Sequence, residues 1–222
     1  MRLALFDLDG TLIPGDSDHA FGEFLIAIGW ADETEFHRRN DEFFQQYQAG
    51  RLDIESYVDF ATGPWRRRPA AEQQAARQRF MAEVMRPQIR PAALDLVRSH
   101  QQQGDLVAIV TATNEFVTAP IAEAFGVEHL IAVRLARDAH GAATGRIDGT
   151  PSFREGKNQR VDDWLRGIGH RFGDFAETLF YSDSTNDLPL LERVSVPVAT
   201  NPGAGLEAIA IERGWRILRL FE

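Results

Sequence analysis

The chain has 222 residues, of which 44% are hydrophobic, so it can bury one sizeable core and is not expected to be disordered. Its 24 basic and 33 acidic residues give a formal net charge of −9, which disfavours nucleic acid or an anionic membrane as a partner and suits a bound divalent cation. The absence of cysteine excludes disulfides and thiol chemistry, and no apolar run approaches the ~20 residues of a membrane helix, so we expect a soluble cytoplasmic protein.

Short apolar runs alternate with segments of helical spacing along most of the chain. The runs that predict buried strands are residues 3–6, 106–110, 130–133, 179–182, 194–199 and 216–221. The segments that predict helices are residues 90–104, 114–126, 157–169 and 203–214. This alternation predicts βαβ units and therefore a doubly wound parallel sheet of the α/β class.

One long region interrupts the alternation. Residues 18–85 carry no strand signal and are rich in aromatic side chains at helical spacing, such as Phe36, Phe43 and Tyr47 on one face. We interpret residues 16–85 as a small helical domain inserted after the first strand. A surface helical hairpin without a function is the alternative interpretation.

The remaining residues, 1–15 and 86–222, are then expected to form the core domain. Within the core, residues 134–149 contain several glycines between short apolar pieces. This pattern predicts a β-hairpin outside the main sheet.

Two carboxylates follow the first strand in the sequence FDLDGT. Side chains alternate along an extended chain, so Asp7 and Asp9 project to the same side, at the strand end where ligands bind in parallel sheets. Clustered carboxylates repel each other unless one is protonated or a cation lies between them, and an oxygen cluster favours Mg²⁺. The pair suggests a nucleophile and a general acid/base, although two spaced aspartates alone are also typical of turns and helix caps.

Two further residues have positions that suit phosphate binding. Thr111 ends the second strand, where its hydroxyl can donate to a phosphate oxygen or cap the next helix, a role that Thr113 or Asn114 could also fill. Lys157 begins a helix, where a lysine is electrostatically unfavourable. It is either a functional residue or an ordinary surface lysine.

A last acidic pair occurs in the sequence SDSTNDLPLL. Asp183 directly follows a predicted strand, and Asp187 precedes a helix with Pro189 in its first turn. Asp187 could merely cap that helix. A cap does not explain Asp183 so readily, because this acid ends a buried strand.

These four segments, in this order and at these separations, resemble the motifs of the haloacid dehalogenase-like (HAD) phosphohydrolase superfamily. The helical insertion resembles the C1-type cap of subfamily IB, the subgroup that contains phosphoserine phosphatase. The resemblance implies a Rossmannoid HAD-like core and a Mg²⁺-dependent phosphatase. It implies that Asp7 is a nucleophile that forms an aspartyl-phosphate and that Asp9 is the general acid/base.

The same resemblance implies a set of ligands. Phosphate or substrate would be bound by Thr111, Ala112, Lys157, Asn186 and Asp16, and Mg²⁺ by Asp7, the backbone carbonyl of Asp9 and Asp183, with Asp187 nearby. Phosphoryl transfer depends on positioning and on neutralising charge, which such a set would supply.

The sequence departs from phosphoserine phosphatases in the residues that read the substrate. It has TATNEF where they carry SGGF, Asp16 where they carry a glutamate, and no arginine at the expected position in the insertion. The expected substrate is therefore histidinol phosphate, phosphoserine or a related small amino-bearing phosphomonoester. The arginines at 66–68 either contact this substrate or form a solvated charged surface. Phosphotransfer to an acceptor other than water and a non-catalytic phosphometabolite-binding module are the alternative functions.

Overall fold

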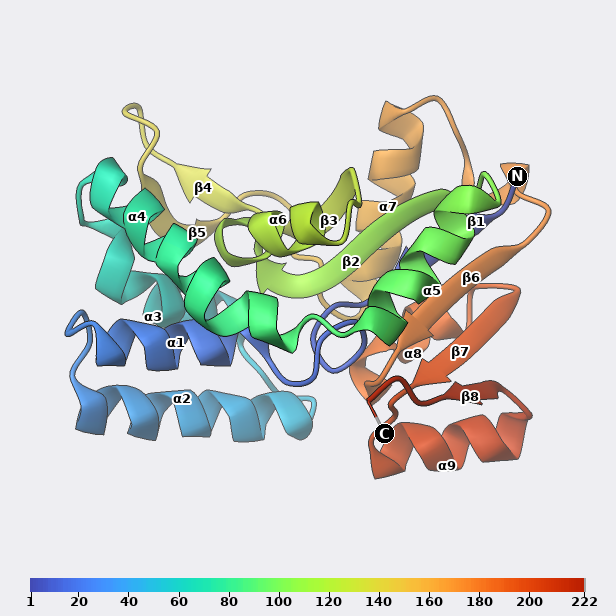
Figure 1. Cartoon of the computed structure of the whole chain (residues 1–222), viewed down its shortest axis with the longest axis horizontal. Helices are drawn as coiled ribbons and strands as arrows, with labels where there is room; N and C mark the ends of the chain where they lie inside the picture. Colours follow the sequence, from blue (N-terminus) through green and yellow to red (C-terminus); the bar gives the residue numbers. More distant parts are fainter. Residues whose placement is uncertain (222) are drawn as a thin grey trace.

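The computed structural model describes residues 1–221, apart from the side chain of residue 48, and its centre is a six-stranded sheet (Figure 1). The strands lie in the order β3-β2-β1-β6-β7-β8, and every neighbouring pair is parallel. They are β1 (Leu3–Phe6), β2 (Leu106–Asn114), β3 (His129–Val133), β6 (Thr178–Ser182), β7 (Val196–Thr200) and β8 (Arg216–Leu218). The doubly wound α/β fold predicted from the sequence is confirmed.

Helices cover both faces of this sheet. They are α5 (Pro91–Gln102), α6 (Glu115–Ala124), α7 (Glu155–Gly167), α8 (Leu188–Leu191) and α9 (Ala204–Arg213). Phe6 of β1 packs in the same buried cluster as Val97 of α5 and Ile121 of α6, whereas Leu5 packs in the opposite cluster with Val161 of α7. Consecutive residues of β1 therefore belong to different layers, as the two-residue period of a strand requires.

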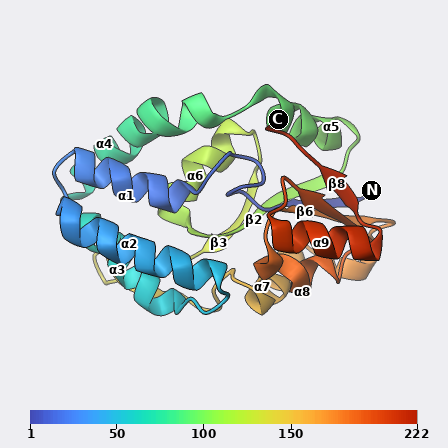
Figure 2. The same ribbon diagram turned by 90° about the horizontal axis from the view of Figure 1, so that it is seen from below.

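Four helices fill the region between β1 and α5. They are α1 (Ser17–Ala27), α2 (Glu33–Gln48), α3 (Ile54–Arg66) and α4 (Ala70–Phe80), followed by a π-helix, Met81–Met85, and a 3-10 helix, Arg86–Gln88. Asp16, Asp32 and Asp53 each cap one of the first three helices by accepting backbone N–H groups. Figure 2 shows α1, α2 and α3 side by side, apart from α8 and α9. The predicted helical insertion is confirmed as helical, and its limits as a domain stay a prediction.

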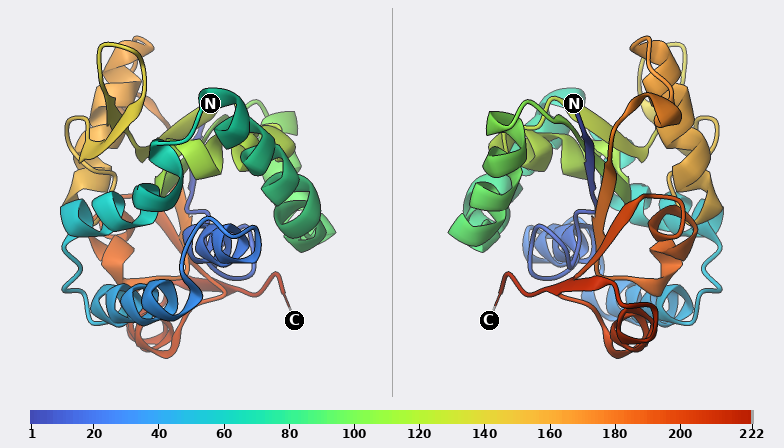
Figure 3. Two further views of the ribbon diagram at one scale, coloured as in Figure 1. Left: turned by 90° about the vertical axis from the view of Figure 1, so that its left-hand side faces the viewer. Right: turned by 90° about the vertical axis from the view of Figure 1, so that its right-hand side faces the viewer.

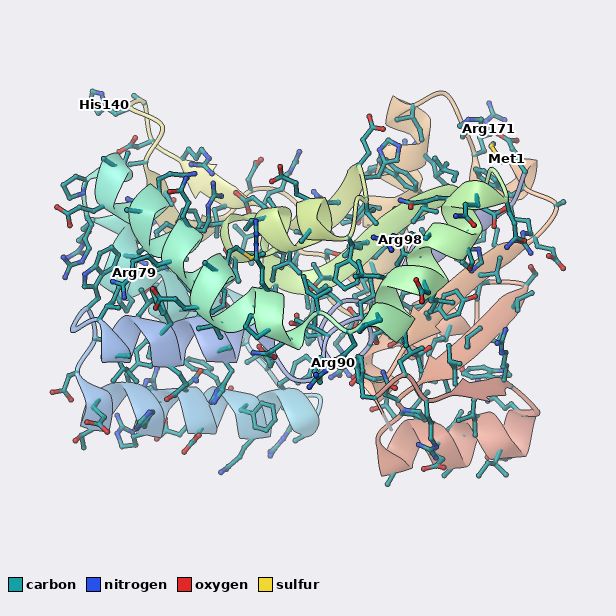
Figure 4. All side chains as sticks on the ribbon, in the orientation of Figure 1. Met1, Arg79, Arg90, Arg98, His140 and Arg171 are labelled. Carbon is teal, nitrogen blue, oxygen red and sulfur yellow. The ribbon has the colours of Figure 1, made fainter. Side chains whose placement is uncertain are left out.

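The predicted hairpin is also present. Strands β4 (Leu135–Arg137) and β5 (Ala143–Ile147) pair antiparallel, and His140 lies at the exposed turn between them (Figure 4). The hairpin packs against α3, where a Cβ on Gly145 would lie only 2.1 Å from Arg66 Nη1.

Both ends of the described chain lie at the sheet end of the molecule, away from α1–α4 (Figure 1), and Figure 3 shows them well apart, with the N-terminus above and the C-terminal end below. Of the helices in the described part of the chain, none has the length and apolar character needed to cross a membrane.

Candidate active site

The order of the strands brings the four predicted motifs to one edge of the sheet. Strand β1 lies between β2 and β6, so the residues that follow these strands meet at their carboxyl ends. Lys157 Nζ lies 2.9 Å from Asp7 Oδ1, and Thr111 Oγ1 lies 3.4 Å from Asp9 Oδ2. Residues more than 100 positions apart thus form one cluster.

The tight turn after β1 depends on Gly10. Its φ is +74°, and a Cβ at this position would lie 2.3 Å from Asp183 Oδ2, so only glycine allows the acid to approach. Thr11 Oγ1 donates to Asp183 Oδ1 at 3.1 Å. Asn201 Nδ2 donates to the carbonyls of Gly10 and Thr11 at 2.9 and 3.1 Å, a brace that sequence reasoning missed because the partners are so far apart.

Asp9 is held in place by three donors. Its Oδ1 accepts from the Ser17 backbone N–H at 2.6 Å, and its Oδ2 accepts from Thr113 Oγ1 at 2.9 Å as well as from Thr111 at the longer distance above. Burial, with repulsion from Asp16, raises the pKa of Asp9 to about 7. A carboxyl that titrates near neutrality can both give and take a proton at physiological pH. The contact from Thr113 was not predicted.

Lys157 is 2% exposed, and its ammonium bridges two carboxylates. Its Nζ lies 2.9 Å from Asp7 and 2.8 Å from Asp187. Burial acts to lower the pKa of Lys157, but the attraction of Asp187 and Asp7 raises it overall, so the lysine is charged. Asp187 makes no capping hydrogen bond to α8 and accepts from Ser182 Oγ at 2.7 Å instead. The surface-lysine and helix-cap interpretations are therefore wrong.

The hydroxyl of Thr111 is not used as a helix cap. Asn114 caps α6, because its Oδ1 accepts from the Val117 backbone N–H at 3.4 Å. Thr111, Ala112 and Thr113 all line a cavity at the strand ends. The Thr111 hydroxyl accepts from the Thr113 backbone N–H at 3.1 Å and makes only the long 3.4 Å contact with Asp9, so it lies at the cavity where the sequence predicts a phosphate ligand.

The remaining carboxylates suit a hard cation. Burial raises the pKa of Asp7 to about 7 against the attraction of Lys157, and burial together with repulsion from Asp7 and Asp187 raises that of Asp183 well above its usual value. Within residues 1–221, no basic side chain forms an ion pair with Asp183, and no three acidic or histidine side chains are grouped so that they alone could hold a metal. The carboxylates of Asp7 and Asp183, together with the backbone carbonyl of Asp9, fit Mg²⁺, because this ion commonly keeps several waters among its ligands.

A narrow cavity of about 50 Å³ lies between the strand ends and the helical insertion. The core lines it with Asp7, Asp9, Thr111, Ala112 and Thr113, and the insertion with Asp16, Asp18, His19, Asn40, Phe43, Phe44, Tyr47, Leu52, Ile54 and Tyr57. Four aspartates and several aromatic rings face the space, and none of the described lining residues is a lysine or an arginine.

Several predicted residues lie beside this cavity rather than on its wall. Lys157 contacts the cavity residue Asp7 and also Asp187, and Asp183 accepts from Thr11 in the turn after β1. The Asn186 amide donates to the Tyr47 carbonyl at 3.1 Å and so connects the core to the insertion.

The arginines at 66–68 do not line the cavity. Arg66 pairs with Asp59 at 2.7 Å, and the Arg68 guanidinium lies 4.1 Å from the ring centre of Trp30. Arg66 fits neither interpretation of this basic run, because its side chain is only 12% exposed and bonds within α3, whereas Arg67 is exposed and agrees with the charged surface.

Comparison with known proteins identifies the class to which this fold and site belong. The model of the haloacid dehalogenase-like hydrolase family matches residues 4–192. A histidinol-phosphatase of Neisseria meningitidis serogroup C is 44% identical over 217 residues, which are 98% of each chain. Phosphoserine phosphatase SerB1 of Mycobacterium tuberculosis is 30% identical and covers 96% of this chain and 69% of the relative.

Solved structures agree with this assignment. A protein of unknown function from Bordetella pertussis Tohama I is 52% identical, with a TM-score of 0.93 over 99% of both chains. A substrate-bound phosphoserine phosphatase, 18% identical, has the same fold with a TM-score of 0.67 over 97% of this chain and 91% of that one. The chain therefore belongs to the haloacid dehalogenase-like hydrolases. Within that family the relatives indicate a phosphoric monoester hydrolase, as the sequence motifs predict.

Proposed function

We propose that this phosphomonoester hydrolase acts on a small amino-bearing substrate, with histidinol phosphate as the first candidate. The observation that carries the proposal is the charge of the cavity wall, which has four aspartates and neither lysine nor arginine among its described residues. A substrate ammonium finds opposite charge there, whereas a substrate carboxylate finds none. This favours an amino alcohol phosphate over phosphoserine, and the 44% identical histidinol-phosphatase supports the same choice.

In the proposed reaction, a carboxylate oxygen of Asp7 attacks phosphorus and forms an aspartyl-phosphate. The bond between phosphorus and the ester oxygen breaks, and protonated Asp9 gives its proton to the leaving alkoxide. Asp9, now ionised, takes a proton from the water that attacks the aspartyl-phosphate. Inorganic phosphate leaves, Asp7 is regenerated, and Asp9 is protonated for the next turnover. The pKa of Asp9, about 7, suits both steps.

Mg²⁺ would be held by Asp7, Asp183 and the backbone carbonyl of Asp9. When bound, the ion supplies positive charge that offsets the repulsion between the anionic nucleophile and the anionic phosphate. Thr11 orients Asp183 for this role through its 3.1 Å hydrogen bond.

The phosphate group would be held by groups on both sides of Asp7. Lys157 brings a fixed positive charge to 2.9 Å from the nucleophile and so lies close to the transferring phosphoryl group. The Thr111 hydroxyl and the backbone at Ala112 line the cavity and can donate to phosphate oxygens. Asn186 is proposed to help bind the phosphate from the position in which its amide donates to the Tyr47 carbonyl.

We also propose that residues 16–85 act as a cap on a core made of residues 1–15 and 86–222. The insertion supplies most of the cavity wall, so it would exclude bulk water and limit the size of the substrate. A phosphopeptide should accordingly be hydrolysed with a far lower kcat/KM than a small phosphomonoester. Equal kcat/KM values for the phosphopeptide and the small phosphomonoester would contradict the proposal that residues 16–85 limit the size of the substrate.

The test of the function is a comparison of histidinol phosphate, phosphoserine and nitrophenyl phosphate with purified protein and Mg²⁺. We expect kcat/KM for histidinol phosphate to exceed that for phosphoserine by at least about tenfold, because desolvating an unpaired carboxylate costs several kcal/mol. Equal or better hydrolysis of phosphoserine would overturn the proposal. Phosphate release that matches substrate loss in the presence of added alcohols would establish hydrolysis rather than phosphotransfer.

A further inference from the structure

The cavity wall contains a buried carboxylate, Asp18, that the proposed reaction does not use. Asp18 lies in the first turn of α1 and is 8% exposed. Its Oδ1 accepts from Asn114 Nδ2 at 3.4 Å, and the Tyr57 hydroxyl forms a second hydrogen bond with it. Both partners are neutral, and no described basic side chain forms an ion pair with it. A buried carboxylate without a cation is costly, so it invites a cationic ligand.

The neighbouring acid, Asp16, differs from Asp18 in its contacts. Asp16 Oδ1 accepts from the backbone N–H groups of Asp18 and His19, both at 2.9 Å. Asp16 is therefore the N-cap of α1, and its oxygen is already occupied by the helix end. Of the two acids that the insertion places on the cavity wall, Asp18 is the one whose hydrogen-bond partners are the neutral side chains of Asn114 and Tyr57.

Asp18 and Asp9 line the same cavity and are contacted by neighbouring residues of β2. Asp9 accepts from Thr113 Oγ1 at 2.9 Å, and Asp18 accepts from Asn114 Nδ2 at 3.4 Å. Asp9 faces the ester oxygen in the proposed reaction. Asp18 is therefore a second carboxylate on the cavity wall, where it can meet a cation elsewhere on the same substrate.

We propose that Asp18 determines specificity by binding the ammonium group of the amino-bearing phosphomonoester. This inference rests on the proposed function and names the residue that recognises the amino group. The rest of the substrate would pack against Phe43, Phe44 and Tyr57, which line the same cavity. These rings suit an aromatic or apolar substituent on the amino-bearing carbon.

The electrostatics of Asp18 agree with this geometry. Burial, with repulsion from Asp16, raises the pKa of Asp18 to about 7. A bound ammonium would favour the ionised carboxylate and lower that pKa, so binding and ionisation support each other.

The test compares Asp18→Asn with Asp16→Asn and with Asp32→Asn. Asparagine keeps the shape of the side chain and an acceptor oxygen for Tyr57 and Asn114 but removes the charge. Asp32 is a matched control, because it caps α2 through the Glu35 backbone N–H and does not line the cavity. Each variant is assayed on histidinol phosphate and on the same ester without its amino group.

We expect Asp18→Asn to lower kcat/KM for histidinol phosphate by about 10- to 100-fold and to change kcat/KM for the deaminated ester by less than about threefold. Turnover of nitrophenyl phosphate reports that the catalytic centre of each variant is intact. Asp16→Asn should impair both esters to a similar extent, and Asp32→Asn should change neither.

Equal losses on the two esters in Asp18→Asn, or a selective loss in Asp16→Asn instead, would overturn the role of Asp18 and leave the proposed function standing. The proposed function fails separately if the wild-type protein turns over nitrophenyl phosphate but shows no preference for the ester that carries the amino group.

Discussion

Replacing Asp18 with asparagine should stabilise the protein, and the gain should depend on pH. The substitution keeps the size of a side chain that is 8% exposed and leaves an oxygen to accept from Tyr57 and Asn114. It removes the negative charge, which contributes most to the cost of burying this side chain. The variant should therefore fold into the same structure at lower electrostatic cost.

The magnitude follows from the pKa of Asp18, which burial and Asp16 raise from 3.8 to about 7. A carboxyl with a raised native pKa binds its proton more tightly in the folded than in the unfolded state, so its contribution to stability falls as pH rises from about 4 to 7. The change is roughly three pKa units at 1.36 kcal/mol each, or at most about 4 kcal/mol above pH 7. The asparagine side chain of the variant cannot titrate and avoids this loss.

Thermal unfolding of both proteins, followed by circular dichroism from about pH 4 to about pH 8.5, measures the effect. At the acid end we expect similar Tm values, and at the alkaline end a Tm for Asp18→Asn that is higher by about 5–15 °C. Titrating groups that do not interact with Asp18 cancel in the difference, and loss of the repulsion with Asp16 acts in the same direction. A gain independent of pH, or a lower Tm for the variant at alkaline pH, would refute the reasoning. The Asp32→Asn control should show no such trend.

Further outcomes test the catalytic assignment. Asp7→Asn should lower kcat by about four orders of magnitude, and near-normal turnover in a phosphate-release assay would exclude Asp7 as the nucleophile. Asp9→Asn should slow alkyl phosphates more than nitrophenyl phosphate, whose leaving group needs no proton, and equal losses would contradict the acid role when phosphorylation limits both rates. Lys157→Met leaves two buried carboxylates unpaired and should lower the free energy of unfolding by about 3–5 kcal/mol in urea, whereas an unchanged midpoint and slope would show that the pairs do not stabilise the fold. Chelation should abolish activity, Mg²⁺ should restore it and Ca²⁺ should restore it poorly, while full activity after metal removal would rule out the cation site.

The fold could be predicted because its signals are local. Each strand of the sheet is a short apolar run, and the acids and hydroxyls that follow β1, β2 and β6 lie at the strand ends where parallel sheets bind ligands. The main difference is the length of β2, which continues four residues beyond the predicted end at Val110 to Asn114. Three of these four residues are polar: Thr111 and Thr113 line the cavity, and Asn114 caps α6. Hydrophobicity alone therefore ends the strand too early.

The hydrogen bonds that hold the site residues in place could not be predicted, because they join residues that are remote in sequence. Asn114 and Asp18 are 96 residues apart, and Asn201 and Gly10 are 191 apart. The sequence around each asparagine does not distinguish a residue that makes such a long-range hydrogen bond from an ordinary cap or turn residue. Asn114 in fact serves as both, since it caps α6 and also donates to Asp18.

The distribution of charge explains why a buried acid would be kept at a cost to stability. Lys157 and the proposed cation site place positive charge at the nucleophile, and Asp18 places negative charge on the wall that the insertion supplies. A zwitterionic substrate with phosphate at one end and ammonium near it fits this field in one orientation only, because the reverse orientation would bring like charges together at both ends. The buried carboxylate of Asp18, which is unfavourable in the free protein, would thus make an attractive contact when the substrate binds. This is the trade of stability for function that active sites commonly show.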